Sequence, residues 1–125
     1  MAFSARYLSL VVRFLHTTIN NRMNLKDVVK ELESFAPSSL AASWDNVGLL
    51  IEPSGDKQVG KMFLTNDLTE AVMEEAIEVN ADLILSYHPP IFRPLKKLTT
   101  NNWKERIAVA CLENKIGETR KSLCV

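Results

Sequence analysis

His88 is the residue of this chain whose type and position most clearly suggest chemistry. It follows the apolar run 83–85 and precedes Pro89 and Pro90. Because both prolines lack the backbone N–H that a sheet requires, the strand must end here, with His88 on a stiff loop. In open α/β sheets ligands bind at this end of a strand, where a neutral imidazole can ligate a metal or transfer a proton. A loop histidine bonded only to water or to a carbonyl fits the same sequence.

Other polar residues could join His88. Arg93, Lys96 and Lys97 lie on the segment 91–101 and could meet phosphate, although cations on an exposed loop are more often simply solvated. Asp45 and Asp67 could supply carboxylate ligands. A turn explains Asp45 equally well, and a helix cap explains Asp67.

A strand, helix and strand over residues 59–86 must position His88. We expect strands near 59–65 and 82–86, with a helix near 68–79 that Asp67 caps and Glu70 supports from its first turn. Asn80 suits the end of that helix. A right-handed crossover then makes the two strands parallel neighbours and places His88 beyond the carboxyl end of the second strand.

The flanking segments predict further elements. Asn24 can cap a helix that Pro37 stops, and an apolar strand over 47–51 could form a hairpin with 59–65. Asn102 with Glu105 should cap a last helix, which Gly117 ends. The apolar residues that this last helix should bury are Trp103, Ile107, Ala110 and Cys111.

The end of the chain departs from the alternation of strands and helices. A third parallel strand is expected after Gly117, but residues 118–125 form a polar octapeptide that predicts no core strand. We therefore predict an incomplete layered α/β fold, with a parallel or mixed sheet flanked by helices, as the N-terminal part of a C-terminally truncated longer fold. A small natural domain with a frayed tail is the alternative.

Composition narrows the class of protein. The chain has 125 residues, enough for one domain, and its 15 basic and 15 acidic residues give no reason to expect direct nucleic-acid binding. Two cysteines do not make a disulfide framework, and no apolar run approaches the roughly 18 residues of a membrane helix. These features predict a soluble protein of a reducing compartment, the cytoplasm and by extension the nucleus.

Residues 1–23 differ from the rest. They contain no acidic residue, carry Arg6 and Arg13, and would be amphipathic as a helix. This pattern is typical of a mitochondrial targeting leader. A disordered extension, or a start at Met23 that bypasses the leader, fits as well.

Three stretches together carry a family resemblance. They are Ser-Trp-Asp-Asn-Val-Gly-Leu over 43–49, Asn-Asp-Leu-Thr-Glu over 66–70, and Asp-Leu-Ile-Leu-Ser-Tyr-His-Pro-Pro-Ile-Phe over 82–92. In this order and spacing they resemble the N-terminal part of the NIF-three-like family, whose bacterial members bear the name GTP cyclohydrolase type-two homologues. The resemblance covers residues 24–117, and it is nearest to animal members. We therefore divide the chain into a leader (1–23), a partial α/β domain (24–117) and a divergent tail (118–125).

The resemblance implies an α/β protein that oligomerises and, in full-length bacterial members, holds two divalent metal ions beside the sheet. His88 matches the second histidine of the bacterial His-His-Pro turn, and Tyr87 replaces the first. A neutral phenol is a much poorer metal ligand than an imidazole. The remaining family ligands fall beyond Gly117. His88 is thus predicted to be a vestigial metal position, with no cofactor and no catalytic residue in this form.

Two functions follow from the resemblance. The first is a non-catalytic protein-interaction role, through self-association and transcriptional corepressor proteins, because animal relatives are linked to corepression. The second is a divalent-metal-dependent hydrolase of a nucleotide or another phosphate-containing substrate, with His88 as ligand. A single histidine cannot close a two-metal site, so the ligand deficit favours the first.

Overall fold

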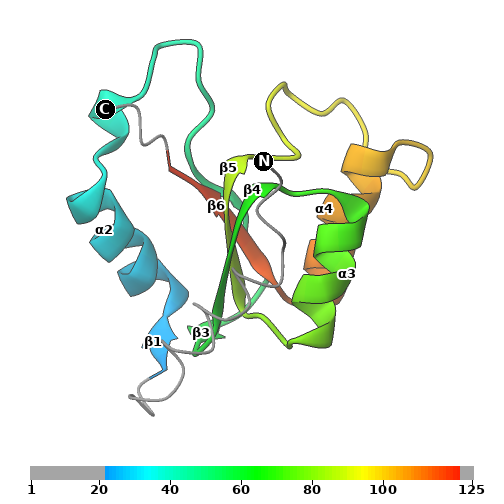
Figure 1. The fold of residues 1–125 in the computed structure, drawn as a ribbon, viewed down its shortest axis with the longest axis horizontal. Helices are drawn as coiled ribbons and strands as arrows, with labels where there is room; N and C mark the ends of the chain where they lie inside the picture. Colours follow the sequence, from blue (N-terminus) through cyan, green and yellow to red (C-terminus); the bar gives the residue numbers. More distant parts are fainter. Residues whose placement is uncertain (1–21, 122–125) are drawn as a thin grey trace, which may run out of the picture.

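The computed structural model describes residues 22–121. The expectations for residues 1–21 and for 122–125 therefore lie outside the described residues. The main feature is a mixed four-stranded sheet with the strand order β2-β6-β5-β4. Figure 1 shows β4, β5 and β6 at its centre. Its strands are β2 (Gly48–Ile51), β4 (Met62–Asp67), β5 (Leu83–His88) and β6 (Gly117–Arg120). A second sheet pairs β1 (Met23–Asn24) with β3 (Gln58–Val59).

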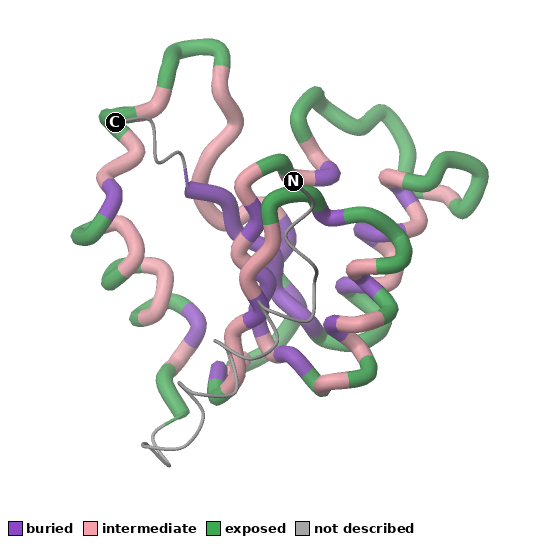
Figure 2. The backbone as a smooth tube through the Cα atoms, viewed as in Figure 1, coloured by how far each residue is buried: buried purple, intermediate pink, exposed green. Residues whose placement is uncertain are grey.

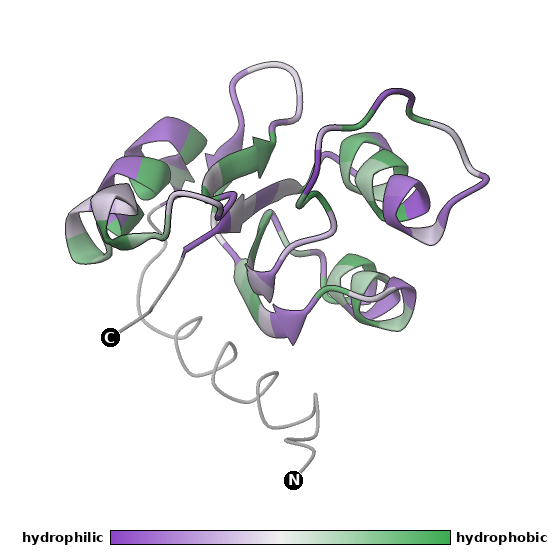
Figure 3. Ribbon diagram, turned by 90° about the horizontal axis from the view of Figure 1, so that it is seen from above, coloured by the Kyte–Doolittle hydropathy of each residue, from purple (hydrophilic) through white to green (hydrophobic). Residues whose placement is uncertain are grey.

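Helices cover both faces of the larger sheet, as Figure 1 shows and Figure 3 repeats from above. One face carries α2 (Leu25–Phe35), whose Leu25 packs against Val59 and Leu83. The other face carries α3 (Glu70–Glu78) and α4 (Trp103–Glu113), and here lies the larger core around Phe63 and Ile84. A short 3₁₀ helix, η1 (Ser38–Leu40), follows α2. The predicted α/β class with a mixed sheet flanked by helices is confirmed.

The β4-α3-β5 unit confirms the expected parallel pair. The register runs from Met62 opposite Leu83 to Asp67 opposite His88. Two details differ from the expectation. The helix is capped by Thr69, whose hydroxyl accepts a hydrogen bond from Val72 N at 3.3 Å, and Asp67 is the last residue of β4. Because β4 continues to Asp67, this residue lies too far before the first turn of the helix to cap it.

The other helix caps were largely predicted. Asn24 caps α2 and Asn102 caps α4, each accepting a hydrogen bond from the backbone N–H two residues on. Asn80 has the expected left-handed conformation, with φ 53°. At the end of α4 this conformation belongs to Lys115, with φ 53°, and Gly117 instead begins β6. A Cβ atom on Gly117 would approach Leu83 Cδ1 to 3.0 Å, so a larger residue there would force the Leu83 side chain to move by a few tenths of an ångström.

The predicted hairpin between residues 47–51 and 59–65 is wrong. Strand β2 pairs antiparallel with β6, and the short β3 pairs with β1.

Trp103, expected in the core, is 43% exposed, because α4 turns its Ile107 and Cys111 face to the sheet.

The expectation that the polar tail forms no core strand is also wrong. Residues 117–120 form β6, which lies between β2 and β5, and every residue from Gly117 to Lys121 is buried (Figure 2). Polar side chains can be buried when each has a partner. The Thr119 hydroxyl donates to the Gly48 carbonyl at 3.0 Å, Lys121 pairs with Glu33, and Arg120 pairs with Asp45.

Within residues 22–121, each helix is too short or too polar to cross a membrane.

Candidate functional site

The parallel pairing of β4 and β5 brings Asp67 and His88 together at one end of the sheet. They are register partners, and His88 Nδ1 lies 2.8 Å from Asp67 Oδ1. Both side chains are open to solvent, with 60% and 69% of their surfaces exposed. His88 is the last residue of β5 and therefore lies at the strand end, one step earlier than predicted. The sequence located the histidine and offered Asp67 as a possible carboxylate ligand, but it favoured a helix cap as the role of Asp67.

Tyr87 lies beside this pair. Its ring meets the His88 ring edge-on, with the two centroids 4.7 Å apart. Its backbone carbonyl accepts a hydrogen bond from Arg120 Nε at 2.7 Å, and the guanidinium carbon of Arg120 lies 5.9 Å from the centre of the Tyr87 ring. Arg120 therefore fixes the backbone next to His88 from the neighbouring strand.

Asp45 lies in a different environment from the one that a metal ligand requires. Its side chain is only 3% exposed and forms an ion pair with Arg120. Oδ1 of Asp45 also accepts a hydrogen bond from Asn46 N at 2.9 Å. A carboxylate whose oxygen already serves a buried guanidinium is not free to bind a cation. Asp45 is thus a structural residue that ties the loop before β2 to β6.

The donors around His88 do not fit a two-metal hydrolytic site. The imidazole of His88 and the carboxylate of Asp67 are two donors, whereas such a centre needs several protein ligands for each ion. In the described part of the chain, no group of three or more His, Cys, Asp or Glu side chains is arranged to hold a metal.

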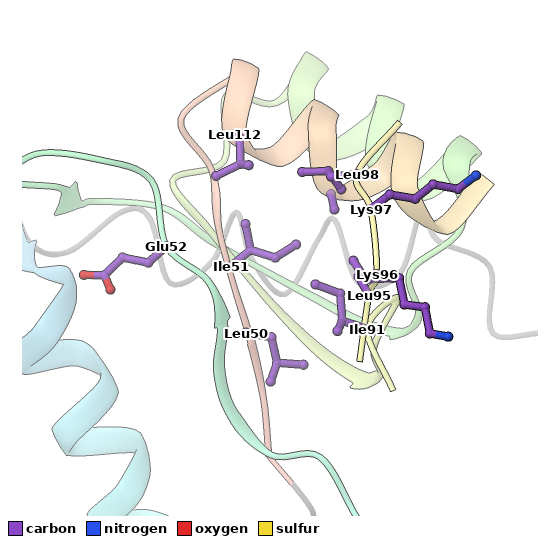
Figure 4. A pocket seen from close by; sticks show the side chains of 10 residues that line it. Leu50, Ile51, Glu52, Ile91, Leu95, Lys96, Lys97, Leu98 and Leu112 are labelled. Carbon is purple, nitrogen blue, oxygen red and sulfur yellow. The ribbon is translucent and has the colours of Figure 1, made fainter. Parts of the chain in front are cut away.

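The cations proposed for phosphate binding line another part of the surface. Lys96 and Lys97 border an open groove of about 420 Å³ between β2, α4 and the loop that follows β5 (Figure 4). His88 and Asp67 do not line this groove. Arg93 is an exposed residue of the same loop. The structure thus places Lys96 and Lys97 at a groove that the histidine does not line.

Glu118 is a titratable group that sequence reasoning missed. Its side chain is fully buried on β6, and Ser86 Oγ donates a hydrogen bond to Oε1 at 2.5 Å. Its second oxygen, Oε2, has no hydrogen-bond partner in the described region. Burial raises the pKa of Glu118 to about 7, against an ordinary value of 4.5. The only available signal was positional, because residue 118 falls where the fold needs another strand.

Cys111 of α4 lies in the same core. Burial is the main cause that raises the pKa of the Cys111 thiol to about 12, and the charge of Glu118 adds to it. A thiol in this environment is not a nucleophile at neutral pH.

Comparisons with known proteins agree with the fold and the motifs. The human NIF3-like protein 1 is 56% identical over 110 residues, which are 85% of this chain and 29% of that protein. The Drosophila melanogaster NIF3-like protein 1 is 63% identical over 93 residues, which are 74% of this chain and 32% of that protein. The chain thus spans about a third or less of the length of these relatives.

Bacterial proteins extend the comparison. The Bacillus subtilis protein named GTP cyclohydrolase 1 type 2 homolog is 36% identical over 95 residues, 76% of this chain and 25% of that protein. The crystal structure of a Bacillus cereus protein related to NIF3 matches with a TM-score of 0.74 and 32% identity, covering 82% of this chain and 28% of that one. The model of the family Duf34/NIF3 (NGG1p interacting factor 3) matches residues 23–118. The chain therefore belongs to the Duf34/NIF3 family.

Proposed function

We propose that this chain acts through protein–protein contacts, first with a second copy of itself, and not as an enzyme. The observation that carries the proposal is the open edge of the sheet at β4. This strand ends the order β2-β6-β5-β4 and, within residues 22–121, pairs on one side only. Its sequence from Met62 to Asn66 contains no charge and no proline, the devices that usually protect an edge from pairing.

The surface beside this edge is apolar and hollow. A cavity of about 190 Å³ lies against the ends of β4 and β5. It is lined by Leu64, Thr65, Asn66, Leu85, Ser86, Tyr87 and Lys121. Leu64 and Leu85 are only half-buried there. Two β4 strands related by a twofold axis could pair and cover both cavities, because a twofold contact presents the same surface twice.

A transcriptional corepressor protein is the partner class that we propose besides a second copy. The support is the family description, which names an interaction with NGG1p. This role would place the chain in the cytoplasm and the nucleus, or in mitochondria where the leader is used.

A divalent-metal-dependent hydrolase is the second candidate. It is favoured by the contact between His88 and Asp67 and by the name GTP cyclohydrolase 1 type 2 homolog of bacterial relatives. The small number of metal-donor groups beside His88 argues against it. If a metal bound here at all, His88 would be the nitrogen ligand and Asp67 the oxygen ligand.

Sedimentation velocity over a range of protein concentrations tests the proposal. We expect the wild-type chain to associate as its concentration rises, and Leu64→Glu to abolish this association by placing charge at the β4 edge. Leu40→Glu is the matched control, because Leu40 is 60% exposed on η1, outside the sheet. A chain that stays monomeric, or association that Leu64→Glu leaves unchanged, would overturn self-association through β4.

A further inference from the structure

The groove beside β2 is a hollow that the proposed self-association leaves unused. Its floor is Leu50 and Ile51 of β2, one wall is Ala108 and Leu112 of α4, and the other wall is the loop carrying Ile91, Leu95 and Leu98. Figure 4 shows the side chains of Ile51, Ile91 and Leu98 around the hollow. Leu95, Leu98 and Leu112 each keep more than 40% of their surface exposed. An apolar hollow of about 420 Å³ has room for several side chains of a ligand.

The floor of the groove is also an open sheet edge. Strand β2 is the other end of the order β2-β6-β5-β4, and its described pairing is with β6 alone. Its outer backbone N–H and C=O groups can therefore receive a further strand, and pockets beside such an edge select alternate side chains of that strand.

The positive and negative charges around the groove lie on different sides of it. In Figure 4 the amines of Lys96 and Lys97 extend from one rim away from the apolar centre, and Glu52 lies on the opposite side. Within residues 22–121, the amine of neither lysine forms a salt bridge, because no carboxylate oxygen lies within 4 Å of it. The charge of Lys97 does reach the Glu105 carboxylate over a longer distance. The two hydrogen bonds from Thr99 are the main causes that lower the pKa of Glu105, and the charge of Lys97 adds a smaller lowering. The lysine rim therefore favours an anionic ligand.

We propose that the β2 groove binds an extended segment of a partner protein that adds as a strand to β2. The segment alternates apolar residues, which fill the hollow, with acidic residues, which face Lys96 and Lys97. This interaction differs from self-association at β4 in surface and in partner. A second copy is a poor occupant, because its β2 has no acidic residue and its β4 has only Asp67, at the very end.

The probe is a fluorescent peptide of about eight residues, the length of an ordinary strand, in which Val and Leu alternate with Glu. A second peptide carries Lys in place of each Glu. Anisotropy measures binding to the full chain carrying Leu64→Glu, so that association through β4 does not interfere. We expect saturable binding of the Glu peptide that weakens as salt is added, and at least tenfold weaker binding of the Lys peptide.

Chain variants locate the binding. Lys96→Glu together with Lys97→Glu should weaken the Glu peptide by about tenfold, whereas the control Lys30→Glu, at an 80% exposed position on α2, should have no effect. Leu95→Ser should also weaken binding, and Leu40→Ser, at an exposed leucine outside the groove, should not. Amide hydrogen exchange should show that the peptide protects residues 48–51.

Four results would overturn the proposal. The two peptides could bind equally, which would show simple apolar adhesion. Binding could persist unchanged in the double lysine variant, or the protected amides could map to β4 instead of β2. Absence of binding at millimolar peptide would reject the groove as a strand acceptor and leave the β4 proposal standing, because the two are measured separately.

Discussion

Arg120 and Asp45 form a buried ion pair between residues that are 75 positions apart in the chain. Their side chains are 7% and 3% exposed. Arg120→Met leaves the Asp45 carboxylate buried without its partner, which should lower the free energy of unfolding by about 3–5 kcal/mol. Urea denaturation measures this loss.

The double variant Asp45→Asn with Arg120→Met is the control for that loss. It removes both charges, so most of the stability should return. A single variant that costs under about 1 kcal/mol, in the range of exposed pairs, would show that the ion pair does not hold β6 in the sheet.

Glu118 should make stability fall as the pH rises from about 4.5 to about 7. Its pKa is about 7 in the folded chain and 4.5 in the unfolded chain, so in this range the folded state binds a proton that the unfolded state has lost. Below 4.5 both states are protonated and above 7 both are ionised, so the effect stops at these limits. The whole change corresponds to roughly 3 kcal/mol.

Glu118→Gln checks the assignment, because an amide cannot ionise and can still accept the hydrogen bond from Ser86. Chemical denaturation at a series of pH values should give a flatter profile between 4.5 and 7 for the variant than for the wild type. Identical slopes would mean that another group is responsible or that Glu118 is solvated.

Glu33 should govern how the stability depends on pH in a separate, more acidic range. Lys121 is the first cause that lowers the pKa of Glu33 to about 2, followed by hydrogen bonds from Ser38. The folded-state pKa is lowered, so the contribution of Glu33 is present above about 4.5 and is lost as the pH falls toward 2. Glu33→Gln should flatten the acid limb of the stability curve, and Glu74→Gln, at an exposed position on α3, should leave it unchanged.

Removal of residues 1–22 should leave the melting midpoint nearly unchanged, because the apolar stripe of the leader has no counterpart in the later alternation of strands and helices. The pairing of Met23 with Val59 is retained in the shortened chain. Circular dichroism melts of the two chains make the comparison, and a drop of more than about 5 °C would indicate that the leader packs on the domain.

Local signals in the sequence predicted much of this fold. Alternating apolar runs and the prolines after His88 gave the β4-α3-β5 unit, and Asn24 and Asn102 marked two helix starts. Strand β6 could not be found in this way. Most of its buried polar groups are satisfied by partners 32 to 75 positions away in the chain, so its composition alone resembles a loop.

The candidate site likewise depends both on local sequence features and on long-range strand pairing. His88 was found because a strand end and a proline turn are local features. Asp67 was taken for a helix cap, since a carboxylate just before a helix suits that role, and only the register of β4 with β5 brings it to the imidazole. The long-range pairing, and not the motif, makes the contact between these two residues.

The claim that this chain is an interaction protein and not a metal-dependent hydrolase is tested most directly by the metal content of the purified chain. Elemental analysis after dialysis against divalent ions, run beside a nucleotide hydrolysis assay, should find far less than one tightly bound ion per chain and no turnover. One or more tightly bound ions per chain, with nucleotide turnover that His88→Ala abolishes and Leu40→Ser preserves, would contradict it.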